Sequence, residues 1–333
     1  MISFKTVLNF LNLRKNEPQE STDDQVLQDS QIGEAAGRAA ADPEVERILH
    51  RQLQLQGESA VNKEVPGASI TSQWQGKHAG HPTADFFLTK RLESGKLLVV
   101  VGDLSGKGVA ITHDSDTGSL ALSYFGGEFI CKLHEALNSS GEITSVTGPA
   151  DAIRLIDRIV TESPDPKAPN MLAGKYMVMA AVVIDSSNGT VEASVHGTPP
   201  IFIRKPGGDI QVIRGSGCPI GILPIDDVQV EQVKNLSEGT EILIMTDGLT
   251  DLKLTGWANE FGLTQRVIDI LTPEDSTFFR SGSGEVVGAD YDGRQARAGL
   301  FSSDRDNQTS LERLVQQAGE HAVDDWGYLR IKL

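Results

Sequence analysis

The sequence predicts an α+β fold in which antiparallel sheets carry helices on their outer sides. Short runs of strand length recur along the chain, and several follow one another without a helix between them. The helical patterns come in groups, so the strict strand-helix alternation of a doubly wound parallel sheet is missing. Apolar and charged fractions of 39% and 23% are ordinary for a globular chain, and 333 residues suffice for a sizeable core.

The first predicted element is a helix over residues 43–56. Asp42 is a suitable N-cap, Pro43 suits the first helical position, and Gly57 ends the pattern. Acidic residues in the first turn favour the same start because they interact well with the helix dipole.

Two of the predicted strands, residues 97–101 and 176–184, are apolar throughout, as in strands buried on both faces. Helical patterns lie at residues 122–137, from 149 to about 160, at 263–271 and at 309–318. The remaining predicted strands lie at residues 68–74, 86–92, 191–195, 201–204, 210–213, 228–233, 241–246 and 328–333.

The chain divides into three predicted parts. Residues 1–42 are expected to be a flexible acidic N-terminal segment, because they lack any apolar period. Residues 43–66 contain a linker or regulatory helix, and residues 67–333 form the main domain. Within that domain, the polar segment at about 273–308 is too long for an ordinary loop, so we expect an insertion.

Composition excludes several classes of protein. Thirty Lys and Arg against 46 Asp and Glu give a net charge of −16, which disfavours nucleic acid and anionic membranes as partners. No apolar run reaches the ~18 residues of a membrane-spanning helix, and we identify no signal peptide. Cys131 and Cys218 are far apart, which favours a reducing cytoplasm over a disulfide framework.

Aspartates fall at the ends of four predicted strands. Asp103 and Asp247 follow apolar runs, whereas Asp85 and the pair Asp324-Asp325 precede strands. If these ends converge, the carboxylates cannot all stay ionised without a cation among them. Oxygen ligands suit Mg²⁺ or Mn²⁺, and two such ions can assist attack on a phosphoryl group.

The competing interpretation is that each aspartate is a helix cap or a turn residue, which is the usual role at strand ends. For a single aspartate this interpretation is preferred. Asp103 and Asp247 fit it less well, because each ends a deeply buried run, where an unpaired charge is costly.

Other motifs carry less weight. The glycine-rich stretch at 102–108 lacks the spacing and the hydroxyl residue of a nucleotide P-loop. The acidic stretches at 114–116 and 290–293 lack the remaining ligands of an EF-hand. His78 and His81 could be ligands, but a solvated loop explains them as well and is favoured.

Two motifs give the chain a family resemblance. Gly-Asp-Leu-Ser-Gly-Lys-Gly (102–108) and Thr-Asp-Gly-Leu-Thr-Asp (246–251) resemble motifs of the SpoIIE-like bacterial branch of the metal-dependent type 2C (PPM) serine/threonine protein phosphatases. The stretch 83–87 and the pair 324–325 match two weaker motifs in the same order. The resemblance covers about residues 43–333.

The resemblance implies a four-layer α-β-β-α sandwich of two antiparallel sheets flanked by helices, with residues 67–333 as the phosphatase domain. It also implies two divalent ions, Mn²⁺ or Mg²⁺, where the sheet ends meet. The metal ligands carried over are Asp85, Asp103, the Leu104 carbonyl, Asp247 and Asp324, of which Asp85, Asp103 and Asp247 are also the catalytic residues.

The implied activity is hydrolysis of phosphoserine or phosphothreonine by a metal-bridging hydroxide, without a covalent phosphoenzyme. Lys107 could reach the substrate phosphate, although a loop lysine is more often simply solvated. The implied partner is a phosphorylated regulatory protein, with a STAS-type anti-sigma-factor antagonist as candidate. The 43–56 helix is a candidate for regulation or for forming a homodimer.

This chain departs from the family motifs at several positions. Thr83 and Ala84 replace paired glycines, Leu88 replaces a frequent acid, Thr198 replaces a histidine, and Gly327 replaces a threonine. All four principal metal positions nevertheless keep aspartate, so an active enzyme is the leading hypothesis. A catalytically silent binding module with the same fold is the alternative from another class, and a phosphatase of small molecules is a third possibility.

Overall fold

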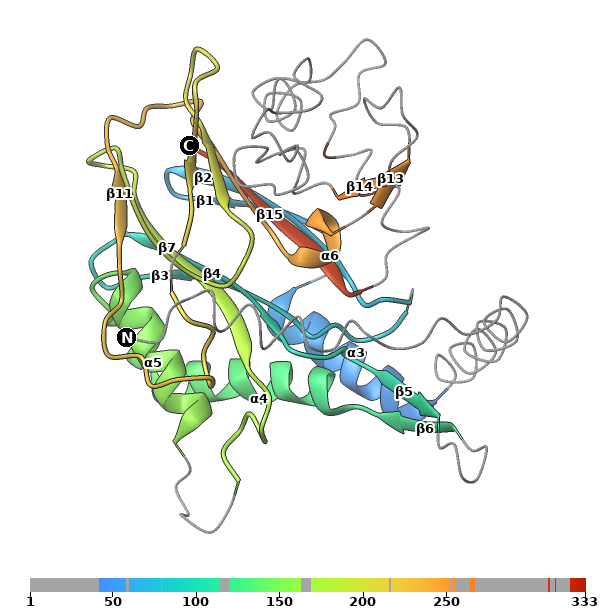
Figure 1. Ribbon diagram of the computed structural model, residues 1–333. Coiled ribbons are helices and arrows are strands. Elements are labelled where there is room, and N and C mark those ends of the chain that lie inside the picture. The colour runs from blue at the N-terminus through green and yellow to red at the C-terminus, as the bar shows by residue number, and fades with distance from the viewer. Residues whose placement is uncertain are drawn as a thin grey trace, which may run out of the picture.

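The computed structural model describes residues 42–57, 60–78, 80–113, 120–162, 169–215, 217–251, 253–255, 264–266, 311, 315 and 324–333. Two antiparallel sheets pack against each other, and helices cover the outer side of one of them (Figure 1). The predicted α+β class with two antiparallel sheets is therefore confirmed. Residues 1–41 of the flexible segment predicted over residues 1–42 lie outside the described residues, as does the insertion predicted at about 273–308.

The five-stranded sheet has the order β11-β8-β7-β4-β3. Its middle strands carry the long apolar runs, as expected for strands covered on both faces. The bounds are β3 (Asp85–Arg91), β4 (Leu97–Leu104), β7 (Met177–Asp185), β8 (Thr190–His196) and β11 (Glu231–Val233).

The six-stranded sheet has the order β1-β2-β15-β12-β9-β10, so the last strand of the chain pairs between an early strand and a late one. The bounds are β1 (Ala60–Val65), β2 (Ala68–Gln75), β9 (Ile201–Arg204), β10 (Ile210–Ile213), β12 (Glu241–Met245) and β15 (Trp326–Lys332). β1 precedes the domain boundary predicted at residue 66, and it is fully paired with β2.

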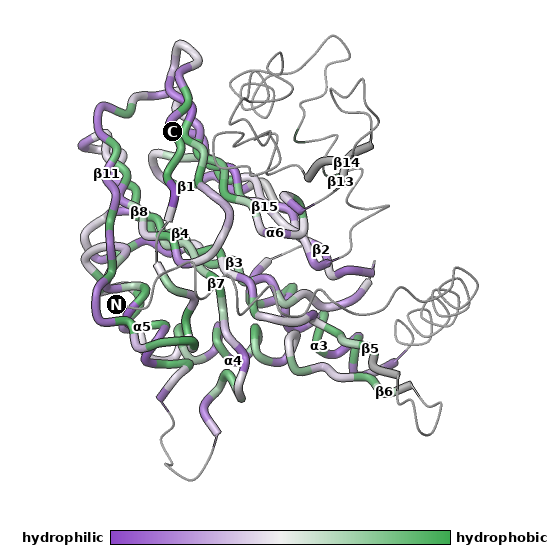
Figure 2. Tube along the Cα trace, viewed as in Figure 1, coloured by the Kyte–Doolittle hydropathy of each residue, from purple (hydrophilic) through white to green (hydrophobic). Residues whose placement is uncertain are grey.

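The two faces of β4 enter different cores, because successive side chains of a strand point to opposite sides. Val99 and Val101 pack between the sheets, against residues such as Ile242 of the six-stranded sheet. Leu98 and Val100 pack on the opposite face, under the helices. Figure 2 shows in green the hydrophobic residues along the central strands of the sheets.

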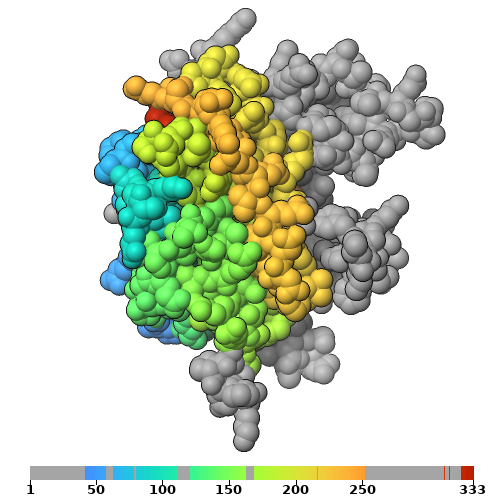
Figure 3. Space-filling model, turned by 90° about the vertical axis from the view of Figure 1, so that its left-hand side faces the viewer, coloured from blue at the N-terminus to red at the C-terminus, as the bar shows by residue number. Residues whose placement is uncertain are grey.

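Two helices form the layer below the five-stranded sheet. α4 (Phe125–Ser140) and α5 (Pro149–Thr161) contribute buried side chains such as Leu133 and Ile156 to the core under β4. A short 3-10 helix (Glu142–Thr144) connects them. The chain after β10 then crosses the surface beside α5, where Ile220 pairs with Met177 of β7 (Figure 3).

The smaller elements lie near the ends of the sheets. α6 (Asp247–Thr250) follows β12 and contacts β15. β5 (Ala110–His113) and β6 (Leu120–Ser123) form a hairpin, so the helix predicted from residue 122 begins only at α4. β13 (Lys253–Thr255) pairs with β14 (Thr264–Arg266), and the helix predicted over 263–271 is therefore wrong at these positions.

Helix α3 (Pro43–Gln56) has the predicted bounds, and Asp42 caps its first turn through the Glu44 N–H. Val45 and Ile48 are buried within the same chain. Any homodimer through α3 would therefore use its exposed face, which includes Glu46 and His50.

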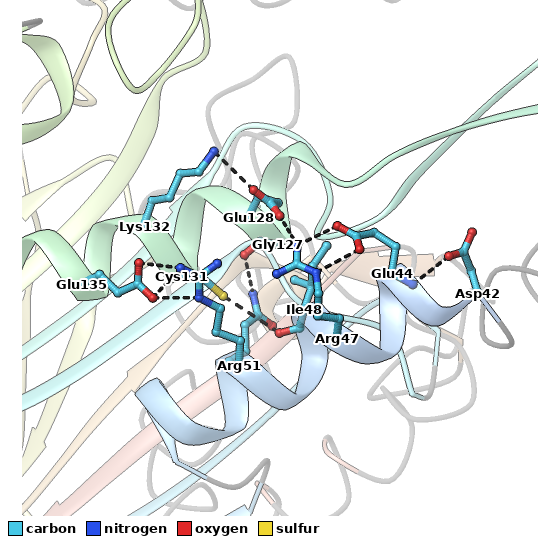
Figure 4. A network of polar contacts seen from close by, with 11 residues as sticks. Asp42, Glu44, Arg47, Ile48, Arg51, Gly127, Glu128, Cys131, Lys132 and Glu135 are labelled. Carbon is cyan, nitrogen blue, oxygen red and sulfur yellow. Dashed lines mark hydrogen bonds and ion pairs between the residues drawn. The ribbon is translucent and has the colours of Figure 1, made fainter.

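Ion pairs join α3 to α4 (Figure 4). Arg51 donates to both carboxylate oxygens of Glu135 at 2.7 and 2.6 Å, and Arg47 pairs with Glu128. Solvent-accessible pairs contribute little to stability, so burial of the apolar side chains stabilises this packing more than the ion pairs do. None of the helices in the described part of the chain has the length and apolar composition needed to cross a membrane.

Candidate metal centre

Asp85 and Asp103 are direct neighbours across a strand pair. Asp85 is the first residue of β3, and the antiparallel register sets it opposite Asp103 of β4. Directly opposite residues share a face of the sheet, and this face is the one between the sheets. Asp103 therefore lies within a strand that continues to Leu104, and not after the strand as predicted.

A hydrogen bond joins this pair to the other sheet. The Thr246 hydroxyl lies 3.0 Å from Asp85 Oδ2 and accepts the Gly327 N–H at 2.8 Å. Thr246 follows β12, and the next residue, Asp247, begins α6. The ends of β3, β12 and β15 thus meet, which is the convergence that the sequence predicted.

Asp324 lies at the edge of this cluster. Its side chain is 42% exposed, and Oδ1 accepts the Lys107 ammonium at 2.7 Å. Lys107 belongs to the loop after β4, so this ion pair links the first family motif to the start of β15. Lys107 therefore faces the carboxylate cluster.

Asp325 differs from its neighbour because it is buried and fully engaged. It is 3% exposed, and three backbone N–H groups donate to its carboxylate. The donors are Lys77 to Oδ1 at 2.6 Å, Ala84 to Oδ2 at 2.7 Å and Gly108 to Oδ2 at 2.8 Å. The adjacent aspartates therefore have different environments.

The carboxyl groups raise one another's pKa. Burial, followed by repulsion from Asp325 and Asp247, raises the pKa of Asp85 well above its usual range. Burial and repulsion from Asp85 do the same for the pKa of Asp103. Burial raises the pKa of Asp247 to about 6, with Asp324 as the next cause. Asp85, Asp103 and Asp247 therefore each lie within electrostatic range of other aspartates of the cluster.

The donor set fits divalent ions of the kind that the fold family implies. All the donors are oxygens, and buried Asp85 Oδ1 has no hydrogen-bond partner among the described residues. In that part of the chain, no three or more His, Cys, Asp or Glu side chains are already gathered so as to hold a metal ion.

Two departures from the family motifs have clear packing roles. The Thr83 hydroxyl accepts the Asp85 N–H at 2.9 Å, and the Ala84 N–H reaches Asp325. Leu88 points to the helix side of β3, in the core under α4, so this position faces away from the carboxylates.

Gly327 has a packing reason of its own. A Cβ added there would lie 2.4 Å from the Phe87 ring. A threonine would therefore collide with the aromatic side chain that this chain carries on β3.

The solvated-loop interpretation is wrong for His81, which is 3% exposed, with its ring centroid 5.3 Å from that of His78.

Sequence reasoning missed the supporting roles of four polar side chains, two of which stand in motifs that it had noted. These are Thr246, Asp325 and two glutamines of α3. Gln52 donates to the Thr83 carbonyl at 2.7 Å and accepts the Thr83 N–H at 3.0 Å, and Gln56 accepts the Phe87 N–H at 2.8 Å. A glutamine within an amphipathic helix gives no sequence signal of such a role, whereas Asp325 could have been suspected from its place in the acidic pair.

Two facing antiparallel sheets, with carboxylates at the ends where they meet, define the PPM class of phosphatase folds. The family model described as "Stage II sporulation protein E (SpoIIE)" matches residues 93–277, which is more than half of the 333 residues. The chain belongs to the SpoIIE family.

Two solved structures share this fold. The RsbU and RsbW domains of Rv1364c from Mycobacterium tuberculosis align with a TM-score of 0.52 at 17% identity, covering 82% of this chain and 62% of that one. The SiaA-PP2C domain of Pseudomonas aeruginosa aligns with a TM-score of 0.50 at 16% identity, covering 92% and 98%.

A curated relative is Protein IcfG of Synechocystis sp. (strain ATCC 27184 / PCC 6803 / Kazusa), which is 25% identical over 217 residues. The match covers 60% of this chain and 32% of that protein, so the chain spans about a third of the relative's length.

Proposed function

We propose that this protein is a metal-dependent serine/threonine protein phosphatase that acts on phosphoserine or phosphothreonine of a regulatory partner protein. The observation that carries the proposal is the meeting of Asp85, Asp103, Asp247 and Asp324 from both sheets, with a buried carboxylate oxygen left unpartnered among the described residues. Membership of the SpoIIE family supports the same reaction class.

Asp85, Asp103, Asp247, Asp324 and the Leu104 carbonyl would hold two divalent ions, Mn²⁺ or Mg²⁺. Such ions lower the pKa of a water molecule and offset negative charge on phosphoryl oxygens.

The chain's own residues orient these ligands. Thr246 holds Asp85 through its hydroxyl, and Thr83 fixes the Asp85 N–H. Lys107 is a candidate to contact the substrate phosphate, because its ammonium group lies within the cluster at 29% exposure.

The proposed partner is a phosphorylated regulatory protein, for which a STAS-type domain remains the candidate. The pairing of RsbU and RsbW domains in the Mycobacterium structure supports a regulatory role. Cytoplasmic localisation is proposed from the sequence.

A silent binding module remains the second candidate. It is favoured by the departures from the family motifs, such as Thr198 in place of a histidine and Gly327 in place of a threonine.

The decisive experiment measures p-nitrophenyl phosphate and phosphoserine-peptide hydrolysis with Mn²⁺, with Mg²⁺ and with EDTA. Asp103→Asn and Asp247→Asn should reduce turnover to the EDTA level while the protein remains folded by circular dichroism. Asp185→Asn is the matched control, because Asp185 bonds Ser187 and Asn188 in the β7–β8 turn, at the other end of the sheet.

Full activity of either site variant would refute the metal assignment. A folded wild type without turnover and without Mn²⁺ binding would favour the binding module.

A further inference from the structure

Asp325 connects three segments that are distant in the sequence. Its three donors, Lys77, Ala84 and Gly108, belong to the loop before β3 and to the loop after β4. The Gly108 N–H and the Asp325 carboxylate are separated by 217 residues along the chain. One carboxylate thus satisfies three backbone donors that no regular strand or helix serves.

Each contacted segment carries a residue of the candidate metal centre. Ala84 directly precedes Asp85, Gly108 directly follows Lys107, and Asp325 itself follows Asp324. The Asp325 N–H also donates to Asp324 Oδ1 at 2.9 Å. A shift of the Asp325 side chain would therefore move three site residues at once.

The backbones around this carboxylate are in close contact. A Cβ on Gly108 would lie 2.0 Å from the Pro82 carbonyl oxygen, and one on Gly248 would lie 1.9 Å from the backbone carbonyl oxygen of Asp325. Gly127, in the first turn of α4, donates its N–H to the Gly108 oxygen at 2.9 Å. Because these backbone segments touch without side chains between them, the positions of the loops depend on the hydrogen bonds that the loops make.

The same bonds distinguish Asp325 from a metal ligand. Oδ1 accepts one N–H and Oδ2 accepts two, and the residue is 3% exposed. The Asp324 side chain is 42% exposed, and within the described part of the chain it accepts the Lys107 ammonium and a single backbone N–H, that of Asp325. The two adjacent carboxylates therefore have separate tasks.

We propose that Asp325 is a positioning residue that holds the Asp85 and Lys107 segments in register for metal binding and turnover. This inference rests on the proposed function, since it assigns a role toward the same site. Residues that orient metal ligands typically change metal affinity or activity by about 10–100-fold when they are replaced.

The test uses Asp325→Asn in the full chain. Asparagine keeps one oxygen, which can still accept from Ala84 and Gly108, but both bonds become weaker because the negative charge of the carboxylate is gone. Its amide NH2 group faces the Lys77 N–H, so the Lys77 bond is lost. We expect Mn²⁺ affinity, measured by isothermal titration calorimetry, to fall by about 10–100-fold. The Lys77 amide should exchange fastest by NMR, and the Ala84 and Gly108 amides should also exchange faster than in wild type.

Asp185→Asn is the matched control. Asp185 also accepts bonds from a backbone N–H and from side chains, but at the far end of the sheet. Its replacement should leave Mn²⁺ affinity unchanged, so a general loss of stability cannot mimic the expected result.

Two results would overturn the proposal. One is a folded Asp325→Asn protein that binds Mn²⁺ within about twofold of wild type, far inside the range expected for an orienting residue. The other is wild-type protein in which the Ala84 and Gly108 amides exchange as fast as open loops, which is informative even if the variant does not fold. A wild type that binds no Mn²⁺ would instead refute the proposed function. In that case, exchange of the Ala84 and Gly108 amides still decides whether Asp325 holds the two loops.

Discussion

Replacing Thr246 by valine tests how the two sheets are joined at the site. Valine has nearly the shape of threonine, so the change removes the hydroxyl and leaves almost no cavity. The hydroxyl accepts the Gly327 N–H at 2.8 Å and donates to Asp85 Oδ2 at 3.0 Å, with the Gly327 carbonyl as a longer alternative acceptor at 3.3 Å. Thr246 is 1% exposed, so water cannot replace either bond without rearrangement.

The magnitude follows from these two bonds. An unsatisfied buried N–H costs about 1–3 kcal/mol, and an ordinary hydrogen bond, such as the one to Asp85 in the absence of metal, contributes about 0.5–1.5 kcal/mol. Thr246→Val should therefore lower the free energy of unfolding by about 1.5–4.5 kcal/mol. The loss should also weaken Mn²⁺ binding, because Asp85 is left without a hydrogen-bond partner for its side chain among the described residues.

The assay is urea unfolding in EDTA at pH 7, followed by Mn²⁺ titration of the folded proteins. The expected change is a lower urea midpoint at an unchanged m-value. Thr246→Ser keeps the hydroxyl and should retain most of the stability and the affinity. The reasoning is refuted if valine is as stable as wild type, or if serine is as damaging as valine.

Three further predictions concern pH and packing. In EDTA, the free energy of unfolding of wild type should fall relative to that of Asp247→Asn as pH rises from 4 through 6, by up to about 1.4 kcal/mol per pH unit. The reason is that the folded-state pKa of Asp247 is about 6, so the native state still binds a proton that the unfolded chain has already lost. Equal slopes of the two urea midpoints against pH would contradict this. The pH dependence caused by His134 has the opposite sign, because burial lowers the pKa of this histidine to about 3. Wild type should therefore lose stability relative to His134→Gln as pH falls below about 6.5. Parallel pH profiles of the two proteins would exclude the effect. Gly248→Ala should lower the thermal midpoint of unfolding sharply, because the alanine Cβ would lie 1.9 Å from the backbone carbonyl oxygen of Asp325. An unchanged midpoint would refute the close approach of the two backbones.

Local signals predicted part of the fold to the residue. The bounds of α3 were correct because a cap, a proline and a terminal glycine mark them within the chain itself. β4 was predicted too short, since the apolar run ends at Val101 while the strand pairing continues to Leu104. Residues 264–266 pair with β13, and that tertiary contact overrode the helical spacing around them.

The residues of the candidate site that could be predicted from the sequence are its carboxylates and Lys107. Asp85, Asp103, Asp247 and Asp324 could be found because acids at strand ends are visible in the sequence. Their supporting bonds could not, because the Thr246–Asp85 contact spans 161 residues of chain and depends on the packing of one sheet against the other.

The glutamines of α3 also cover part of an exposed strand edge. β3 is the outermost strand of its sheet, and such a strand presents backbone donors and acceptors that can pair with another chain. Gln52 and Gln56, one helical turn apart, occupy the Thr83 and Phe87 groups that a foreign strand would seek. A fragment that begins after α3 would expose this edge, so preparations lacking residues 43–56 should be prone to strand exchange and aggregation even where the carboxylates of the candidate metal centre are intact.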